Sequence, residues 1–595
     1  MSPGSVRSLL ILCSSVCLAL FGCSIVRDLS VDQCKTDGDC RKFGDYSCSE
    51  ENVCVANMTN TSGASSGGTK ADGGTESSGG TAGAPVMAEC TKNKDCIDAH
   101  DGEPYICRDE ACVPLTDADN CPYVVAGTEE NPTEYLTKPG KPIIFGAYVP
   151  IDAANPEGHP YTLIYKFALK EFMQATLGGV NGRPFVMVLC QSTEPDLEAS
   201  VGHLVDTVGV PAILASLPSA DLATVLNLVK DRPKPVFLLG PFEADSSLIS
   251  LDEGNRLWHM LGPVTDLVPT YAPLFELAES YVHRVIKKDD PGTPLKVAVI
   301  NTDLTYSLDL AAVLPGKVSI NGHPLNADEN EGYYERVQVP VVGKDPVDTS
   351  DVKGRVESAD IIVSLGGKEF IDPVLKEIQA SRTTNNSPFY ILSPRNTFDA
   401  NLSLPSYYVG ESGTMGMTFV DKVMAGVNYA SVEDSKLYDK YLMDIQVEYP
   451  GQKGLESREN FYDAAYFMLY SLAAASQTST TAREFDGDNV VDGMRALISG
   501  SRDATVGLGE NGDMINYVLG LLDNGVNVRL EGTLGPPNFD ARTGARNSPG
   551  SVWCVSKPGQ TPTVKYDMLR LDPEMPTQLK LSEASFCYPN FFPIP

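Results

Sequence analysis

From residue 121 onward, short apolar runs alternate with stretches of helical length, and this alternation limits the possible folds more than any other feature of the chain. The predicted strands are 141–149, 183–189, 210–215 and 235–239, and the helices between them are 161–177, 195–208 and 219–230. Strands separated by helices in this way are typical of βαβ units, which build a parallel sheet with helices on both faces.

The same rhythm restarts later in the chain, which predicts a second sheet. Its expected strands are 296–300, 337–342, 360–364 and 388–392, with a helix at 368–381. Helices at 434–449, 459–475 and 489–499, and strands near 526–531 and 551–555, follow. The predicted fold class is therefore α/β, with two lobes that are each a doubly wound, mostly parallel sheet, preceded by small disulfide-rich repeats.

The first 22 residues have the pattern of a secretory leader. One positive charge in Met1–Arg7 precedes the apolar stretch Leu9–Leu20, which is too short to span a bilayer stably. The stretch ends in Leu20-Phe21-Gly22-Cys23, which resembles a bacterial lipobox, although Phe21 is bulkier than the usual residue. This resemblance implies removal of residues 1–22, lipidation of Cys23 and, because Ser24 follows, an outer-membrane location in a bacterial envelope. An uncleaved or ordinarily cleaved leader is the alternative.

Two cysteine-rich segments, 23–56 and 89–120, form an internal repeat around a Gly/Ser/Thr-rich flexible linker at 57–88. Cys34–Cys54 has the pattern C-x5-C-x7-C-x5-C, and Cys90–Cys112 has C-x5-C-x10-C-x4-C. Segments this small cannot bury a sufficient core, so two disulfides per repeat are expected, with the pairing left open. Zinc is the rival interpretation, but the x2 spacing of zinc knuckles is missing.

Apart from Cys13, Cys17 and Cys23, the chain has twelve cysteines, an even number that suits an oxidising compartment. Once the repeats pair internally, four remain, and we expect Cys121 to bond Cys190 and Cys554 to bond Cys587. The complete set of expected disulfide cysteines is Cys34, Cys40, Cys48, Cys54, Cys90, Cys96, Cys107, Cys112, Cys121, Cys190, Cys554 and Cys587.

The charge of the chain excludes one class of partner. A net charge of −32 would repel nucleic acid, so no nucleic-acid role is expected. The six histidines show no helical pairing, which argues against a histidine-rich metal site. Gly507-Leu-Gly-Glu-Asn-Gly512 fits a dinucleotide motif but follows no clear buried strand. We therefore expect no metal, no cofactor and no enzymatic activity.

Residues 121 to about 555 resemble the type I periplasmic binding proteins, in particular the branched-chain amino acid binding branch and the ligand-binding regions of related receptors. The resemblance is carried by ordered local matches at Ala212–Asp221, Leu239–Pro241, Lys296–Tyr306, Ala359–Gly367, Phe461–Tyr466 and Glu531–Asp540. It implies a domain at 121–595 with lobe I at about 121–262 and 411–531 and lobe II at about 263–410 and 540–595. Crossovers are expected near Met260–Thr265, Val409–Gly416 and Glu531–Phe539.

The resemblance also implies a ligand site between the lobes. Loops that leave the carboxyl ends of parallel strands converge on a crevice, and helix N-termini there bind anions. The expected ligand-binding residues are Ser216, Ser219, Ala220, Phe242, Tyr306, Gly366 and Arg395. For Ser219 the competing role is a helix cap, and for Tyr306 it is packing.

This chain departs from the family pattern at positions that affect the ligand. Phe242-Glu243-Ala244 replaces a small residue and a Thr/Ser, and Lys368 replaces an aromatic residue. Pro394-Arg395-Asn396 stands near the expected acid, and an arginine there favours a carboxylate or another anion over an ammonium group. Pairing of Arg395 with a surface carboxylate is the alternative.

These observations predict a lipid-anchored extracytoplasmic protein that captures a small, carboxylate-bearing, amino-acid-like solute for uptake or sensing. Its partners would be the solute, a transporter or sensor protein, and the membrane through the lipid anchor alone. A structural or protein-interaction lipoprotein that has kept the fold without a small ligand is the second hypothesis.

Overall fold

The computed structural model describes the chain in part, and the account below covers these residues: 46–48, 54–56, 89–127, 132–151, 158–193, 195–251, 255–342, 348–367, 370, 374, 388–396, 424–429, 436–452, 454–455, 458–478, 485–509, 512–547, 550–556, 563–571 and 579–580. The chain divides into two compact units, Met1–Pro85 and Val86–Pro595. The predicted leader, Cys23, Lys368, the crossover at 409–416 and Cys587 lie outside the described residues.

Each cysteine-rich repeat contains an antiparallel hairpin. In the first repeat, β1 (Tyr46–Cys48) pairs with β2 (Cys54–Ala56), and Cys48 lies opposite Cys54. In the second, β3 (Tyr105–Arg108) pairs with β4 (Ala111–Pro114), and Cys107 lies opposite Cys112. The two hairpins thus have the same register, which supports the internal repeat.

The second repeat is closed by two disulfides, Cys90–Cys107 and Cys96–Cys112. Cys96 belongs to the short helix α2 (Asn93–Ala99), so its bond ties α2 to the hairpin. The sulfurs of Cys90, Cys96 and Cys112 lie within 4.8 Å of one another, but all three are disulfide-bonded. A metal needs free thiolates, and in this repeat the disulfide interpretation is the one the structure supports.

The first large sheet has six strands in the order β10-β9-β8-β6-β7-β5. All neighbours are parallel except β5, which pairs antiparallel with β7 at one edge. The strands are β5 (Tyr123–Ala126), β6 (Ile143–Val149), β7 (Phe185–Gln191), β8 (Ala212–Ala215), β9 (Phe237–Glu243) and β10 (Leu257–Leu261). The expected Cys121–Cys190 disulfide is present and joins a residue two positions before β5 to β7.

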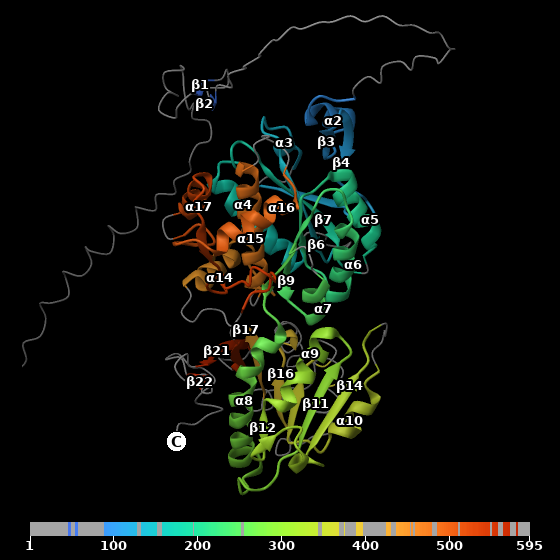
Figure 1. Ribbon diagram of the computed structural model, residues 1–595, viewed down its shortest axis with the longest axis vertical. Coiled ribbons are helices and arrows are strands. Elements are labelled where there is room, and N and C mark those ends of the chain that lie inside the picture. The colour runs from blue at the N-terminus through green and yellow to red at the C-terminus, as the bar shows by residue number, and fades with distance from the viewer. Residues whose placement is uncertain are drawn as a thin grey trace, which may run out of the picture. The chain divides into compact units, whose positions relative to one another are not determined.

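Helices cover both faces of this sheet (Figure 1). Figure 1 shows α4 (Pro160–Ala175) and α15 (Glu459–Thr478) on one side and α5 (Leu197–Val201) and α6 (Ser219–Lys230) on the other. The π-helical turn η2 (Gly202–Val208) extends α5. Helices α14 (Lys436–Glu448), α16 (Gly487–Ile498) and α17 (Met514–Asp523) surround α15 in sequence, and β18 (Arg502–Thr505) pairs with β19 (Val528–Glu531).

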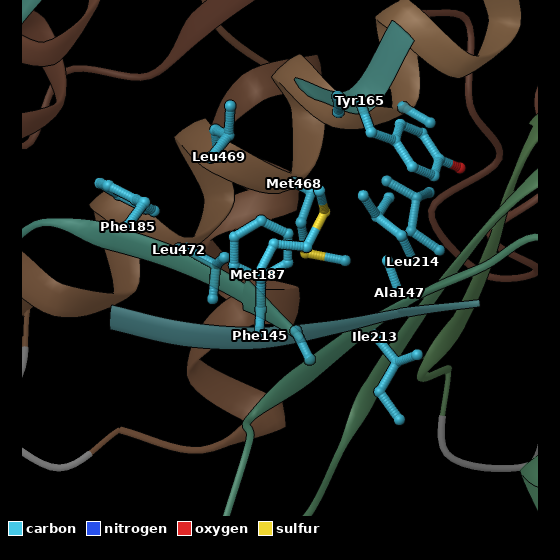
Figure 2. Close-up of a cluster of buried hydrophobic side chains, with 14 of the residues drawn as sticks. Phe145, Ala147, Tyr165, Phe185, Met187, Ile213, Leu214, Met468, Leu469 and Leu472 are labelled. Carbon is cyan, nitrogen blue, oxygen red and sulfur yellow. The ribbon is translucent and has the colours of Figure 1, made fainter. Parts of the chain in front are cut away.

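The core of lobe I lies between this sheet and α4 and α15. Helix α4 starts well because Pro160 occupies its first turn, where its missing N–H costs nothing, and His159 accepts a bond from the Tyr161 N–H. Figure 2 shows Met468, Leu469 and Leu472 of α15 above the strands that carry Phe145 and Met187. Neighbouring Ile213 and Leu214 point to opposite faces, as the two-residue period of a strand requires.

The second large sheet has eight strands in the order β14-β11-β15-β16-β17-β20-β21-β22. The first five are parallel and the last three are antiparallel. They are β11 (Val297–Thr302), β14 (Tyr334–Val339), β15 (Ile361–Ser364), β16 (Phe389–Leu392), β17 (Met424–Tyr429), β20 (Gly550–Ser556), β21 (Thr563–Leu571) and β22 (Leu579–Lys580). The two sheets are separate, as predicted.

Strand β17 corrects one expected boundary. Residues from 411 to 531 were expected in lobe I, but Met424–Tyr429 lies between β16 and β20 in the second sheet. The expected boundary followed a Gly-rich run near 410, whereas hydrogen bonding to two neighbouring strands decides the position of β17. The Tyr429 hydroxyl donates to the Gly262 carbonyl at 2.8 Å, which ties β17 to the segment where the chain leaves the first sheet.

The segment after β19 is held by a buried network. Asp463 of α15 accepts bonds from the N–H groups of Thr533 and Leu534 at 2.8 and 3.0 Å, and the Arg546 guanidinium donates to the Leu534 carbonyl at 2.6 Å. Gly532 is required beside it, because a Cβ there would lie 2.1 Å from the Asp463 carboxylate. Within the described part of the chain, no helix is both long and apolar enough to cross a membrane.

Candidate functional site

The candidate site is formed where parallel strands of both large sheets end. In the first sheet, β9 ends at Glu243, and in the second sheet the segments that follow β11 and β16 carry Tyr306 and Arg395. Tyr306 belongs to the first turn of α9 (Thr305–Val313). Carboxyl ends of parallel strands are where open α/β sheets bind ligands.

Arg395 joins the two sheets. Its Nε donates to Oε1 of Glu243, forming an ion pair in which the Glu243 side chain is 3% exposed and the Arg395 side chain 25%. Burial alone would lower the pKa of the Arg395 guanidinium, but the nearby Glu243 carboxylate raises that pKa above its ordinary value. Arg395 is therefore always charged, and its charge is already balanced by a carboxylate of lobe I.

Two predicted site residues contact the Arg395 guanidinium with their rings. The Arg395 Cζ lies 4.6 Å from the ring centre of Tyr306 and 5.2 Å from that of Phe242. Phe242 comes from β9 and Tyr306 from α9, so one ring belongs to each lobe. Cation–π contacts of this length attract the charge to the ring faces and fix its position.

An aromatic wall extends the site on the lobe I side. Tyr161 stacks on Phe461 with ring centres 3.9 Å apart, and Phe242 meets Phe461 edge-on at 5.4 Å. Tyr161 lies in the first turn of α4 and Phe461 in the first turn of α15, so the starts of both helices supply rings. Neither residue was predicted as a site residue. Phe461 is the first residue of the local family match at Phe461–Tyr466, and that match could have pointed to it.

A second arginine lies beside this wall. The Arg458 Cζ is 5.1 Å from the ring centre of Tyr161, and its Nη1 donates to the Gly454 carbonyl at 2.9 Å. His159 lies nearby, and burial together with the positive charge of Arg458 lowers the pKa of His159 to about 4. His159 is therefore neutral at physiological pH, so Arg458 and Arg395 are the cations beside these rings.

The remaining predicted residues occupy different places around the strand ends. Ser216 is buried, and its Oγ is 2.7 Å from the Tyr165 hydroxyl. The Gly366 carbonyl accepts a bond from the Ser393 Oγ at 2.6 Å, which holds the loop after β15 against the loop that carries Arg395. Ala220 is exposed on the first turn of α6.

Ser219 does not cap its helix, contrary to one expectation. Helix α6 begins at Ser219, the N-cap position is Pro218, and no side chain caps the helix. Pro218 has the extended backbone of an N-cap residue, which leaves Ser219 already in the helical turn. The structure thus brings Phe242, Tyr306 and Arg395 together. It places Ser216 and Gly366 just after β8 and β15, and Ser219 and Ala220 in the first turn of α6.

A second polar contact joins the lobes. Asp309 of α9 accepts bonds from the N–H and the hydroxyl of Ser246 at 3.1 and 2.8 Å. Ser246 begins α7 (Ser246–Leu251), which follows β9. On the lobe I side, Glu243 ends β9 and Ser246 begins the helix that follows it, so both contacts tie this part of lobe I to lobe II.

The chain is similar in fold to solute-binding proteins of ABC transporters. A solute-binding protein of Rhodopseudomonas palustris BisB5, solved in complex with 3,4-dihydroxybenzoic acid, has a TM-score of 0.48 and 12% identity and covers 73% of this chain and 99% of its own. A putative branched-chain amino acid ABC transporter protein of Rhodospirillum rubrum has a TM-score of 0.41 and 16% identity, covering 71% and 100%.

A substrate-binding protein of Desulfitobacterium hafniense, solved in complex with Leu, has a TM-score of 0.41 and 11% identity and covers 71% of this chain and 100% of its own. No family model matches the chain, and no curated protein matches it. Sequence identities this low do not show which ligand this chain binds. The site residues are therefore assigned from the strand ends and side-chain contacts of this chain.

Proposed function

We propose that the chain is a lipid-anchored, extracytoplasmic solute-binding protein that holds a small carboxylate-bearing ligand between its lobes and carries out no chemistry on it. The observation that supports this most is the meeting of Phe242, Tyr306 and Arg395 from two separate sheets. The anchor at Cys23, the outer-membrane location and a role in uptake or sensing belong to the same proposal, on the basis of the leader sequence.

The chemistry of Arg395 explains why a carboxylate is the proposed group. The bond to Glu243 uses the Nε hydrogen, and a guanidinium has four further hydrogens on its two Nη atoms. A carboxylate can accept two of these in the paired geometry that arginine favours. The rings of Tyr161, Phe242 and Phe461 would then contact the apolar part of the ligand.

The first experiment is a thermal-shift screen of amino acids, dicarboxylates, amides and peptides, followed by calorimetric titration of the hits. Arg395→Ala should abolish binding of a dianion, because it removes the cation that holds the second carboxylate. A zwitterion whose single carboxylate is held at Ser219 should bind this variant as well as the wild type or better, because the variant removes a cation near its ammonium group. Ser219 is the first residue of α6 and makes no capping bond, so Ser219→Ala tests the serine contact that the family resemblance implies. Unchanged affinity in both variants would disprove the assigned site.

A structural role is the second candidate, and one observation favours it. The Glu243–Arg395 ion pair and the Ser246–Asp309 contact join the lobes through the chain's own groups. If these contacts are permanent, the lobes need no solute to stay together. Small-angle scattering that shows one unchanging radius of gyration with every solute in the screen would support this candidate over solute binding.

A further inference from the structure

A cavity of ≈ 170 Å³ lies at the amino ends of the strands of the first sheet, away from the candidate site at their carboxyl ends. Its walls come from the second cysteine-rich repeat, from the segments that lead into β6, β8 and β9, and from the segment before α16. The disulfide-closed repeat therefore forms one wall of a hollow on lobe I. By the usual volume of a water molecule, this space holds a group of several heavy atoms.

The charges around this cavity are opposite in sign to the chain as a whole. Four basic side chains and two acidic ones are among its lining residues, which are Arg108, Lys141, Arg183, Lys234, Asp109 and Asp486. The chain carries a net charge of −32. A cavity lined by an excess of positive charge has a positive electrostatic potential, even in so acidic a protein. Such a potential attracts small anions.

Arg108 is held in the cavity wall mainly by backbone groups. Its Nη1 donates to the Thr207 carbonyl at 2.8 Å. Gly209 has a φ of +79°, and a Cβ there would lie 2.3 Å from the Arg108 Nη1, so only glycine admits the guanidinium. The carboxylate of Asp109 is 3.8 Å from Nε and 90% exposed, and such a pair neutralises little charge.

Arg183, another lining residue, is also held by a backbone carbonyl. Its Nε donates to the Lys141 carbonyl at 2.8 Å, and its Cζ lies 5.6 Å from the ring centre of Phe485. The neighbouring Asp486 accepts bonds from the N–H groups of Asp488 and Asn489, so it serves as the cap of α16. Both arginines are thus preorganised before any ligand binds, which lowers the entropic cost of binding.

We propose that this cavity binds a small oxyanion that carries two or more negative charges, of the phosphate type. Guanidinium groups present a planar fork that fits phosphate oxygens, and Lys141 and Lys234 add two further positive charges to the lining. The cavity volume of ≈ 170 Å³ suits a charged group about the size of pyrophosphate. This site is independent of the interlobe site and of whether that site binds a solute.

The test is calorimetric titration of the full chain with inorganic pyrophosphate, with sodium chloride at matched ionic strength as the reference titrant. Arg108→Met and Lys234→Met should each weaken pyrophosphate binding about tenfold or more, the usual effect of losing a charge-assisted bond. Lys234 is exposed, so its variant keeps the fold even if Arg108→Met does not. Near-ultraviolet circular dichroism verifies folding.

Two control variants make the result specific. Arg495→Met removes an arginine of α16 that is 46% exposed and lies outside the cavity, so it should bind pyrophosphate as the wild type does. Arg395→Met disrupts the interlobe site and should also leave pyrophosphate binding unchanged. Equal weakening in all four variants, or equal heat from pyrophosphate and sodium chloride, would overturn the proposal.

A second arm separates the sources of such an oxyanion. Cosedimentation with vesicles that contain phosphatidic acid, whose phosphomonoester can carry two negative charges, is compared with cosedimentation with phosphatidylcholine vesicles and reports a phosphate on a lipid headgroup. If Lys234→Met reduces cosedimentation, the occupant is a lipid phosphate; if it reduces pyrophosphate binding alone, the occupant is a free anion. Failure of the variant to change either measurement contradicts the site.

Discussion

In the Glu243–Arg395 ion pair, removal of one partner should destabilise the fold more than removal of the other. Glu243 is almost fully buried, whereas a quarter of the Arg395 side chain reaches solvent. A charge left without its partner costs more where water cannot reach it. We therefore predict that Arg395→Met, which strands the carboxylate, lowers the free energy of unfolding by about 3 kcal/mol.

The matched change Glu243→Gln should cost less, about 1–2 kcal/mol, because Arg395 can still be solvated and the amide oxygen still accepts its bond. Urea unfolding of both variants at pH 7 measures the difference. A larger loss for Glu243→Gln than for Arg395→Met would show that the buried carboxylate is not the vulnerable partner.

Glu171 makes stability depend on pH. It is buried on α4 and accepts bonds from the hydroxyls of Tyr462 and Tyr466 at 2.6 and 3.0 Å, and burial, partly offset by these bonds, raises its pKa from 4.5 to about 7. Between these values the folded state holds a proton that the unfolded state has lost. Stability therefore falls as pH rises from about 4.5 to 7 and is level above, a change on the order of 3 kcal/mol from this group.

Glu171→Gln keeps an acceptor for the two tyrosines and removes the titration, so most of this decline should disappear. Unfolding free energies at pH 5, 6, 7 and 8 measure it, and Glu134→Gln, an exposed change on α3 (Pro132–Leu136), should keep the full decline. Some slope will remain, because burial also raises the pKa of Glu459 to about 7. Identical pH profiles for the Glu171 variant and the wild type would contradict the assignment.

At the residue scale, the sequence pointed to half of the candidate site. Phe242, Tyr306 and Arg395 were predicted, and the structure brings their side chains together. The partner of Arg395 was not predictable, because Glu243 lies 152 positions earlier and meets it only when two separate sheets face each other. Ser219 was placed correctly at the start of α6, but the preceding proline took the cap position.

At the scale of elements, two helical glycines offer a matched comparison. A Cβ on Gly493 of α16 would lie 2.4 Å from the Ser471 carbonyl oxygen of α15, so the helices pack at a distance only glycine permits. Gly520 of α17 has no neighbour within 4 Å of the same position. We predict that Gly493→Ala destabilises the protein by about 1–3 kcal/mol through overpacking.

Gly520→Ala should instead stabilise the protein by about 0.5–1 kcal/mol, the difference in helix propensity between the two residues. Thermal unfolding of the two variants beside the wild type should therefore give shifts of opposite sign. Shifts of the same sign would mean that α16 can move away from α15 without loss.

The helices and strands that were predicted most accurately are those with the clearest apolar patterns in the sequence. Helix α6 has the predicted bounds, 219–230, and β6, β7, β8, β11 and β16 all lie within two residues of expectation at their first residue, because each is an apolar run between clear breaks. Strand β5 was missed, since four residues at a sheet edge have too short a pattern. Strand β17 was missed because its small residues, Ala425 and Gly426, have weak strand preference.

At the scale of the whole molecule, the shared register of the two hairpins predicts disulfides in the first repeat. Cys107 and Cys112 bond Cys90 and Cys96 respectively, so the first cysteine pairs with the third and the second with the fourth. The same pattern predicts Cys34–Cys48 and Cys40–Cys54. Mass spectrometry of unreduced proteolytic peptides tests this, and a Cys34–Cys40 or Cys48–Cys54 link would contradict it. The Cys554–Cys587 bond stays a prediction for the same experiment.

The disulfide between Cys121 and Cys190 also determines how the large domain responds to mechanical load. The chain enters the first sheet through β5, an edge strand that pairs with one neighbour and would unzip one hydrogen bond at a time when pulled from its start. Because Cys121 precedes β5 and is bonded to β7, tension on the N-terminal segment passes directly into a strand that is paired on both sides. Reduction of that bond should lower the force at which the domain first unfolds in single-molecule pulling. At equilibrium, without load, β5 should stay paired with β7.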